Sequence, residues 1–228
     1  MPAGITRILV VVPVHNEERL LARCLTALER AAARAQVPVR IQLVLDGCTD
    51  ASTRIPGSAV EVLEIDQRNV GAARAAGFAE TGSGCGAETW FATTDADSEV
   101  DQWWLRRQLA YARAGADAVA GVVSVRRWSD HRLLTARRYE RRYRRRLRGR
   151  GHGHIHGANL GFRADLYWRT GGFRHLRTGE DIDLVSRIAA VGARIEWAED
   201  VVVATSARQL GRAPAGFADH LRRIDNAG

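Results

Sequence analysis

Residues 90–97 read WFATTDAD, and this stretch contains the strongest single motif of the chain. Residues 90–94 predict a buried strand, after which the chain carries two carboxylates one residue apart, Asp95 and Asp97. At the end of a strand, one such carboxylate can hydrogen-bond a ribose while the other holds a divalent cation against a diphosphate. A D-x-D triplet also occurs in ordinary solvated turns, so its meaning depends on the surrounding sequence.

Apolar runs alternate with helical patterns on both sides of this strand. Residues 8–14 are continuous, apolar and β-branched, which is typical of a strand buried on both faces. Asn16 is predicted to cap a following helix whose apolar face repeats at helical spacing. Further strands are expected at residues 41–45, 60–65, 118–125, 160–163 and 194–203, and further helices at residues 71–80, 103–114, 131–147 and 181–190. This alternation predicts a single α/β domain with a mainly parallel central sheet flanked by helices on both faces.

The composition is that of an ordinary globular protein, with 228 residues of which 46% are hydrophobic and 26% charged. No stretch approaches the roughly 20 apolar residues that a membrane helix needs, and no cleavage site follows the short apolar run near the start. Cys24, Cys48 and Cys85 are odd in number and lack paired spacing, which argues against a disulfide framework or a zinc knuckle. We therefore expect one cytoplasmic domain over residues 1–228.

Polar residues gather where several of the expected strands end. They include residues 15–17 after the first strand, residues 46–50 after the second, and the D-x-D triplet. Because the carboxyl ends of parallel strands share one edge of a sheet, these residues predict a ligand site at that edge. The first strand is not followed by G-x-G-x-x-G, and no G-x-x-x-x-G-K-[ST] occurs, which argues against dinucleotide-dependent oxidoreductases and P-loop enzymes.

Seven short motifs follow one another in a fixed order along the chain. They are VPVHNEE (12–18), LDGCTD (45–50), NVGAARAAG (69–77), TDAD (94–97), GANLGFR (157–163), GGF (171–173) and GEDIDL (179–184). In this order and spacing the series resembles the family 2 glycosyltransferases of the GT-A fold, over about residues 8 to 190. Each motif is weak alone, and the agreement of all seven carries the resemblance.

The resemblance implies transfer of a hexosyl or N-acetylhexosaminyl group from a nucleotide-diphosphate sugar to an acceptor that the sequence does not identify. A UDP-sugar is favoured over a GDP-sugar as the donor, the transfer is expected to be inverting, and Mn²⁺ or Mg²⁺ is the expected cofactor. The part up to about residue 98 would bind the nucleotide. The part from about residue 99 to residue 228 would hold the acceptor and the catalytic group.

On the donor side, the resemblance assigns several residues to the nucleotide. Asp46 would contact the base, although Leu45 replaces the aspartate that precedes it in the family. Arg74 would lie near the diphosphate, and its alternative is a surface arginine on an alanine-rich helix. The full donor set is Pro13, Glu17, Asp46, Arg74 and Asp95, with Asp97 as the metal ligand.

On the acceptor side, Asp181 matches the family's general base, which takes the proton of the acceptor hydroxyl as its oxygen attacks the anomeric carbon. The alternative for Asp181 is a helix start that is simply rich in acids. Many relatives carry a late histidine that helps to ligate the metal, but residues 203–208 contain none. Either the metal has fewer protein ligands here, or Arg208 supplies the positive charge on the diphosphate instead. The residues expected near the acceptor or diphosphate are His156, Asn159, Glu180 and Arg208.

Histidines alternate at His152, His154 and His156. On an extended segment their side chains would face the same way, because side chains alternate along a strand. The three could bind a transition metal, orient an acceptor, or form a polar loop, and His156 is the one expected closest to the substrate.

Nine arginines crowd residues 137–150, in a chain whose formal net charge is +8. The main rival interpretation is therefore an anion- or RNA-binding protein that uses this segment, or one that contacts an anionic membrane surface. Tyr139 and Tyr143 are too few for a base-stacking platform, so we expect no nucleic-acid partner and do not favour membrane contact. We expect the segment to be a helix beside the active site or a lid over an anionic substrate, which would include an anionic acceptor. A nucleotide-binding protein without turnover is the other rival.

Overall fold

The computed structural model describes residues 4–125 and 153–206. In these ranges, eight strands form one sheet in the order β3-β2-β1-β4-β7-β6-β8-β5. The strands are β1 (Arg7–Val14), β2 (Val39–Asp46), β3 (Glu61–Ile65), β4 (Thr89–Thr93), β5 (Glu99–Val100), β6 (Ala118–Val125), β7 (Leu160–Arg163) and β8 (Ile195–Thr205). The sheet runs through both predicted parts of the chain, so the single α/β domain is confirmed.

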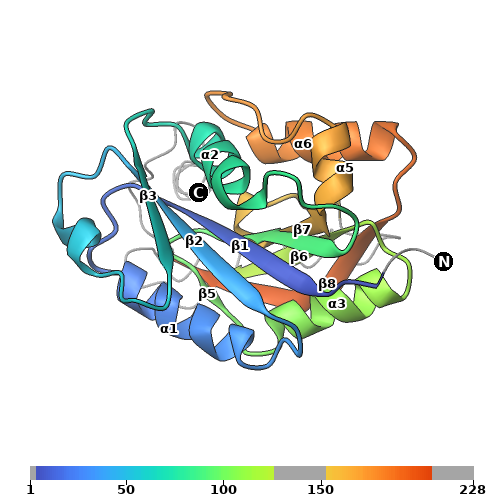
Figure 1. Ribbon diagram of the computed structural model, residues 1–228, viewed down its shortest axis with the longest axis horizontal. Coiled ribbons are helices and arrows are strands. Elements are labelled where there is room, and N and C mark those ends of the chain that lie inside the picture. The colour runs from blue at the N-terminus through green and yellow to red at the C-terminus, as the bar shows by residue number, and fades with distance from the viewer. Residues whose placement is uncertain (1–3, 126–152, 207–228) are drawn as a thin grey trace, which may run out of the picture.

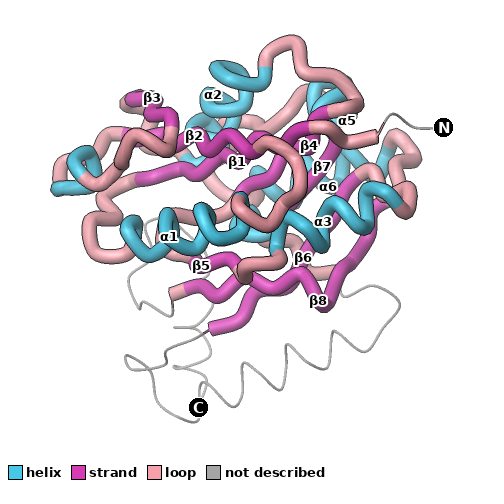
Figure 2. Tube along the Cα trace, turned by 60° about the horizontal axis from the view of Figure 1, so that its bottom comes forward, coloured by secondary structure: helices cyan, strands magenta, loops and turns pink. Residues whose placement is uncertain are grey.

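Helices cover both faces of the sheet (Figure 1). On one face lie α1 (Leu21–Ala32) and α3 (Trp104–Arg113), and on the other lie α2 (Val70–Gly82), α5 (Ala164–Arg169) and α6 (Glu180–Ala190). Figure 2 shows α1 and α3 end to end along their face of the sheet. Two short 3-10 turns, η1 (Ala51–Arg54) and η2 (Gly157–Asn159), precede β3 and β7. None of the helices in the described ranges combines the length and apolarity that a membrane crossing needs.

The strand β1 divides the core into two layers. Ile8, Val10 and Val12 pack with α1 and α3, whereas Leu9 and Val11 pack with α2, α5 and α6. This follows from the period of two along a strand, and it explains why the sequence of β1 is apolar at every position.

Strand direction decides which residues meet at the site. β1, β2, β3 and β4 are parallel, so their carboxyl ends lie along one edge. β7 is antiparallel to β4 and pairs Leu160 with Thr93, which brings η2 to the end of β4. The predicted sheet is thus mainly parallel, with β7 and β5 as its antiparallel members.

Most of the expected strands and helices are confirmed to within a few residues, but the expected helix cap at Asn16 is wrong. The helix α1 begins at Leu21, with Leu20 at the cap position. Asn16 instead has a positive φ of 55° and accepts hydrogen bonds from the backbone N–H groups of Thr49 (2.7 Å) and Asp50 (3.2 Å). Asparagine tolerates this left-handed conformation, and here its side chain ties the turn after β1 to the loop after β2. The helix expected over residues 131–147 lies outside the described residues.

Candidate functional site

The D-x-D triplet lies just beyond the carboxyl end of β4, as expected. Ser98 closes the turn by donating its backbone N–H to the carbonyl of Asp95 (3.0 Å), and its hydroxyl donates to Asp97 Oδ1 (3.2 Å). The hydroxyl of Thr205, at the end of β8, lies 3.0 Å from Ser98 Oγ and can donate to it. The side chain of Asp95 is 37% exposed, so this carboxylate borders the solvent.

Arg74 of α2 lies beneath this turn and is almost wholly buried, with 2% of its side chain exposed. Each of its three nitrogens donates to a protein group: Nε to Thr93 Oγ1 (3.2 Å), Nη2 to Asp95 Oδ1 (2.6 Å) and Nη1 to Glu180 Oε1. Arg74 therefore joins the end of β4 to the start of α6.

Negative charge dominates around this guanidinium. Burial alone would lower the pKa of Arg74, but the neighbouring carboxylates Asp95, Glu180 and Asp181 outweigh it and raise the pKa. For Glu180, burial is the main cause of a raised pKa, which Arg74 opposes and Asp181 and Asp95 reinforce. One cation facing three carboxylates leaves a negative excess, which attracts a divalent cation and repels a diphosphate.

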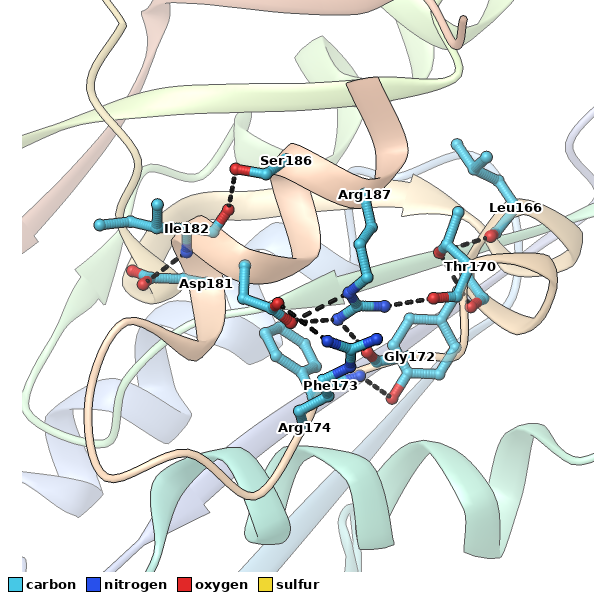
Figure 3. A network of polar contacts seen from close by, with 11 residues as sticks. Leu166, Thr170, Gly172, Phe173, Arg174, Asp181, Ile182, Ser186 and Arg187 are labelled. Atoms are coloured by element: carbon cyan, nitrogen blue, oxygen red, sulfur yellow. Dashed lines mark hydrogen bonds and ion pairs between the residues drawn. The ribbon is translucent and has the colours of Figure 1, made fainter. Parts of the chain in front are cut away.

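Asp181 is the second residue of α6, and its carboxylate is held by two backbone donors. Oδ2 accepts from Gly157 N (2.8 Å) at the start of η2, and Oδ1 accepts from Ile182 N (2.8 Å). The helix begins after Gly179, whose φ of 76° suits glycine in a left-handed turn. Asp181 is half-buried, and its two donors place its carboxylate between α6 and η2. Figure 3 shows this side chain beside Ile182.

A second carboxylate on α6, Asp183, belongs to a different network, whose two arginines, Arg174 and Arg187, are labelled in Figure 3. It accepts from Arg187 Nη2 (2.6 Å) and Nε (3.0 Å) and from Arg174 Nη1 (3.3 Å). Arg187 also donates to the carbonyl oxygens of Thr170 and Gly172. Asp183 and Arg187 therefore fix the loop that leads from α5 to α6.

Asp46, at the end of β2, is 3% exposed. Its Oδ1 accepts from the backbone N–H groups of Gln67 (2.6 Å) and Arg68 (2.7 Å), and its Oδ2 accepts from that of Asn69 (2.7 Å). The carboxylate thus organises the turn that leads into α2. The predicted contact with the base stays a prediction.

The two remaining donor residues lie near the end of β1 and in the turn after it. Pro13 is half-buried near the end of β1. Glu17 is 6% exposed, and its backbone N–H donates to Ser52 Oγ of η1 (2.7 Å). The expected donor residues Pro13, Glu17, Asp46 and the D-x-D triplet therefore lie at or just beyond strand ends that share one edge of the sheet.

The comparisons with known proteins agree with this architecture. A family model described as glycosyl transferase family 2 matches residues 9–171. The chain belongs to this family. No curated protein sequence matches the chain.

Two solved structures show the same fold as this family 2 chain. The mannosyltransferase PcManGT from Pyrobaculum calidifontis, in complex with GDP-Man and Mn²⁺, is 20% identical with a TM-score of 0.69, covering 92% of this chain and 60% of that chain. TarS residues 1–349 from S. aureus, in complex with UDP-GlcNAc, are 14% identical with a TM-score of 0.68, covering 97% of this chain and 66% of that chain. The family 2 chain thus spans about two thirds of the length of these structures or less.

Asn159 is one of the residues expected on the acceptor side of the family 2 chain. Asn159 is fully buried: its Oδ1 accepts from Trp104 Nε1 (2.8 Å), and its Nδ2 donates to the carbonyls of Val122 and Val201 (2.8 Å each). The amide therefore anchors η2 to β6 and β8, and the expected place of Asn159 near the acceptor or diphosphate stays a prediction.

Of the three alternating histidines, the structure describes His154 and His156. The rings of His154 and His156 are stacked with centroids 5.9 Å apart, so these two residues do face the same way. Both rings are half-buried, and His156 directly precedes η2. His152, Arg208 and the arginines of residues 137–150 lie outside the described residues.

The donor set can be tested against the expected divalent cation. Asp95 and Asp97 offer hard carboxylate oxygens, which Mn²⁺ and Mg²⁺ prefer, and both side chains are half-buried. Within the described ranges, no group of three or more His, Cys, Asp or Glu residues is placed to hold a metal. The acids therefore fit an ion whose remaining positions are filled by phosphate oxygens and water, rather than a closed protein site.

Two contributors to the site were missed from the sequence. Thr93 accepts from Arg74, and Gly157 packs against the same guanidinium, since a Cβ at Gly157 would lie 2.5 Å from Nη2. The glycine at the start of the GAN motif was the available signal, because glycine often marks a close approach of the backbone to another group.

Proposed function

We propose that the chain transfers a sugar from a nucleotide-diphosphate donor to an acceptor hydroxyl, with inversion at the anomeric carbon. The observation that carries the proposal is the meeting of the D-x-D turn after β4 with the start of α6. Arg74 bonds to Asp95 on one side and Glu180 on the other, and the next residue along α6 is Asp181. Donor-binding and base-supplying carboxylates thus share one site at the edge where parallel strands end.

The donor half of the proposed site consists of the three strand ends. Pro13 lies near the end of β1 and Glu17 follows it, Asp46 ends β2, and the D-x-D turn follows β4. Asp95 would hydrogen-bond the ribose, and Asp97 would ligate Mn²⁺ or Mg²⁺. When bound, this cation would neutralise the charge that develops on the departing diphosphate.

The catalytic half of the proposed site is the carboxylate of Asp181. It would accept the proton of the acceptor hydroxyl while that oxygen forms its bond to the anomeric carbon and the bond to the diphosphate breaks. The two backbone donors, Gly157 N and Ile182 N, fix the orientation of this carboxylate before the acceptor arrives. Asp183 is a poorer candidate, because Arg174 and Arg187 already bind its carboxylate.

The proposal also specifies the nucleotide and the sugar of the donor. Solved structures of similar fold hold GDP-Man with Mn²⁺ in one case and UDP-GlcNAc in another, so both nucleotide classes occur on this fold. We favour a UDP-sugar, with a hexosyl or N-acetylhexosaminyl group as the moiety transferred. A buried carboxylate such as Asp46 can accept a hydrogen from either uracil or guanine, so binding must decide between them.

A thermal-shift panel tests the proposal. UDP, GDP, UDP-GlcNAc and GDP-mannose are each added with Mn²⁺, with Mg²⁺ or with EDTA. A ligand at about 100 times its Kd stabilises a protein by about 2.7 kcal/mol, so the correct nucleotide should raise the Tm by about 5 to 10 °C. No shift with any nucleotide in either metal would contradict the proposal.

The Asp97→Asn variant tests the metal assignment in the same panel. Its apo Tm should match or exceed that of the wild type, because removing one carboxylate relieves repulsion within an acidic cluster. The metal-dependent part of the nucleotide shift should disappear. Glu88→Gln is the matched control, since Glu88 directly precedes β4 at its opposite end and pairs with Arg7 on the surface. Equal metal-dependent shifts in Asp97→Asn and Glu88→Gln would remove Asp97 from the site.

A further inference from the structure

Arg74 connects two parts of the site that are far apart in the sequence. Its Nη2 donates to Asp95, 21 positions away, and its Nη1 donates to Glu180, 106 positions away. Its Nε donates to Thr93, the last residue of β4. Because a guanidinium is planar and presents its donors in a fixed fork, one group sets the position of Asp95 relative to the start of α6.

The packing around the guanidinium reinforces this connection. The ring of Phe173 lies 5.4 Å from Arg74 Cζ, and the backbone of Gly157 is so close that a Cβ there would lie 2.5 to 2.6 Å from three guanidinium atoms. The N–H of Gly157 then donates to Asp181. Arg74 is thus linked to Asp181 along two routes, through Glu180 on α6 and through Gly157 on η2.

Burial and charge argue against a contact between Arg74 and the donor diphosphate. Only 2% of the side chain is exposed, and every nitrogen already bonds to a protein oxygen. The surrounding carboxylates outnumber its charge, so the site presents no net positive potential there. These observations favour a role of Arg74 inside the protein over the diphosphate contact expected from the sequence.

We propose that Arg74 is a positioning residue that couples the donor carboxylate Asp95 to the catalytic start of α6. The proposal rests on the proposed function, because it concerns the same site. It has a specific consequence for Glu180, which is 6% exposed and bonds to Arg74. Glu180 contributes to donor binding without touching the donor, by holding the guanidinium that holds Asp95.

A double-mutant cycle separates this role from a merely structural one. UDP and GDP affinities are measured with Mn²⁺ for the wild type, Asp95→Asn, Glu180→Gln and the double variant. Coupling through Arg74 predicts that Glu180→Gln weakens binding about ten-fold in the wild-type background and changes little once Asp95 is already replaced. A general loosening of the fold would instead weaken binding by the same factor in both backgrounds, and that additive result would overturn the proposal.

Arg74→Lys provides a second arm that keeps the charge but loses the fork. We expect weaker Mn²⁺-dependent UDP or GDP binding and slower release of nucleotide from UDP-GlcNAc or GDP-mannose. Arg163→Lys is the matched control, because Arg163 is also a buried arginine, 5% exposed, but donates to the carbonyls of Ala87 and Ala112 away from the site. Equal affinities and rates in Arg74→Lys and Arg163→Lys would overturn the proposal.

Gly157→Ala covers the case in which Arg74→Lys does not fold. The added methyl group must displace the guanidinium while all of its partners remain, so we expect the same loss of donor affinity as for Glu180→Gln. Unchanged affinity in Gly157→Ala would count against the coupling. The proposed function fails separately if the wild type binds neither UDP nor GDP, whereas binding by the wild type with an additive cycle would reject the coupling alone.

Discussion

Asp181 and Asp183, two aspartates on the first turn of α6, suit different roles because their hydrogen-bond partners differ. Asp181 accepts from two neutral backbone donors, whereas Asp183 is bound by the guanidinium groups of Arg174 and Arg187. An arginine pair stabilises the ionised form and occupies its lone pairs, which suits an anchor. Backbone donors orient a carboxylate and leave lone pairs for a substrate proton, which suits a base.

This difference predicts opposite effects for two matched substitutions. Asp181→Asn should lower the kcat for nucleotide release from UDP-GlcNAc or GDP-mannose, with water as the acceptor, by about 10²- to 10⁴-fold. The Kd of the nucleotide should change little, because the base acts on the acceptor proton and not on the donor. Rates are measured by nucleotide release and affinities by calorimetry.

Asp183→Asn is the control for the same experiment. It should lower the Tm, because Arg187 loses its charged partner in the loop before α6, but it should leave kcat within a few-fold of the wild type. If Asp181→Asn keeps its turnover and Asp183→Asn does not, the base has been assigned to the wrong aspartate. If binding and turnover fall together in Asp181→Asn, that residue is structural.

At the scale of elements, the sequence predicted the strands well, because buried strands of a mainly parallel sheet are continuous apolar runs. β6 and β7 match the expected residues 118–125 and 160–163 in full. The elements α5 and β5 were missed, since six and two residues are too short for a periodic pattern. The cap at Asn16 failed because its side chain bonds across to the loop after β2, a contact that no local pattern reveals.

The sequence also predicted which residues converge, but not how they bond. The edge shared by the ends of β1, β2 and β4 follows from the parallel order. By contrast, the burial of Arg74 and Asn159 depends on contacts between elements more than 20 positions apart, such as the bond from Asn159 to Val201. Motif matching assigns such residues to the ligand because it cannot distinguish a side chain facing the site from one supporting it.

The element η2 offers a test of this distinction at Asn159. Asn159→Ala would leave Trp104 Nε1 and the carbonyls of Val122 and Val201 without their partner, at a cost of about 1 to 3 kcal/mol for each group that stays unsatisfied. The free energy of unfolding, measured by denaturant titration, should therefore fall by several kcal/mol. Gln102→Ala is the control, since Gln102 is an exposed amide and should change stability by less than about 0.5 kcal/mol.

The affinity of Asn159→Ala for UDP or GDP is measured below the melting temperature of this variant. It distinguishes a residue that supports the fold from one that contacts the substrate. A supporting residue changes stability while the folded fraction still binds the nucleotide. An unchanged free energy of unfolding combined with lost turnover would favour a place for Asn159 at the acceptor site.

At the scale of the whole molecule, the net charge of the chain is positive, whereas the described site is rich in carboxylates. The chain carries a formal net charge of +8, with nine arginines between residues 137 and 150, whereas the described site gathers the carboxylates of Asp95, Asp97, Glu180 and Asp181. An anionic donor approaching these carboxylates needs positive charge from a divalent cation or from basic side chains. Positive charge elsewhere on a protein raises the association rate of anionic ligands, and salt screens this effect.

The arginine-rich segment can therefore serve either the anionic substrates of the proposed reaction or a nucleic acid, and one variant separates the two. We expect that replacing Arg144, Arg145 and Arg146 with glutamine raises the KM of the acceptor and leaves the nucleotide Kd within about two-fold at physiological salt, because the proposed donor contacts come from the strand ends and the D-x-D turn. The wild type should show no tight RNA binding in a gel shift at the same salt. Arg30, Arg106 and Arg113, three exposed arginines on α1 and α3, are replaced with glutamine as a control for the same loss of charge. Tight RNA binding by the wild type that falls steeply with salt, and that is lost in the first variant but kept in the second, would favour the RNA-binding interpretation.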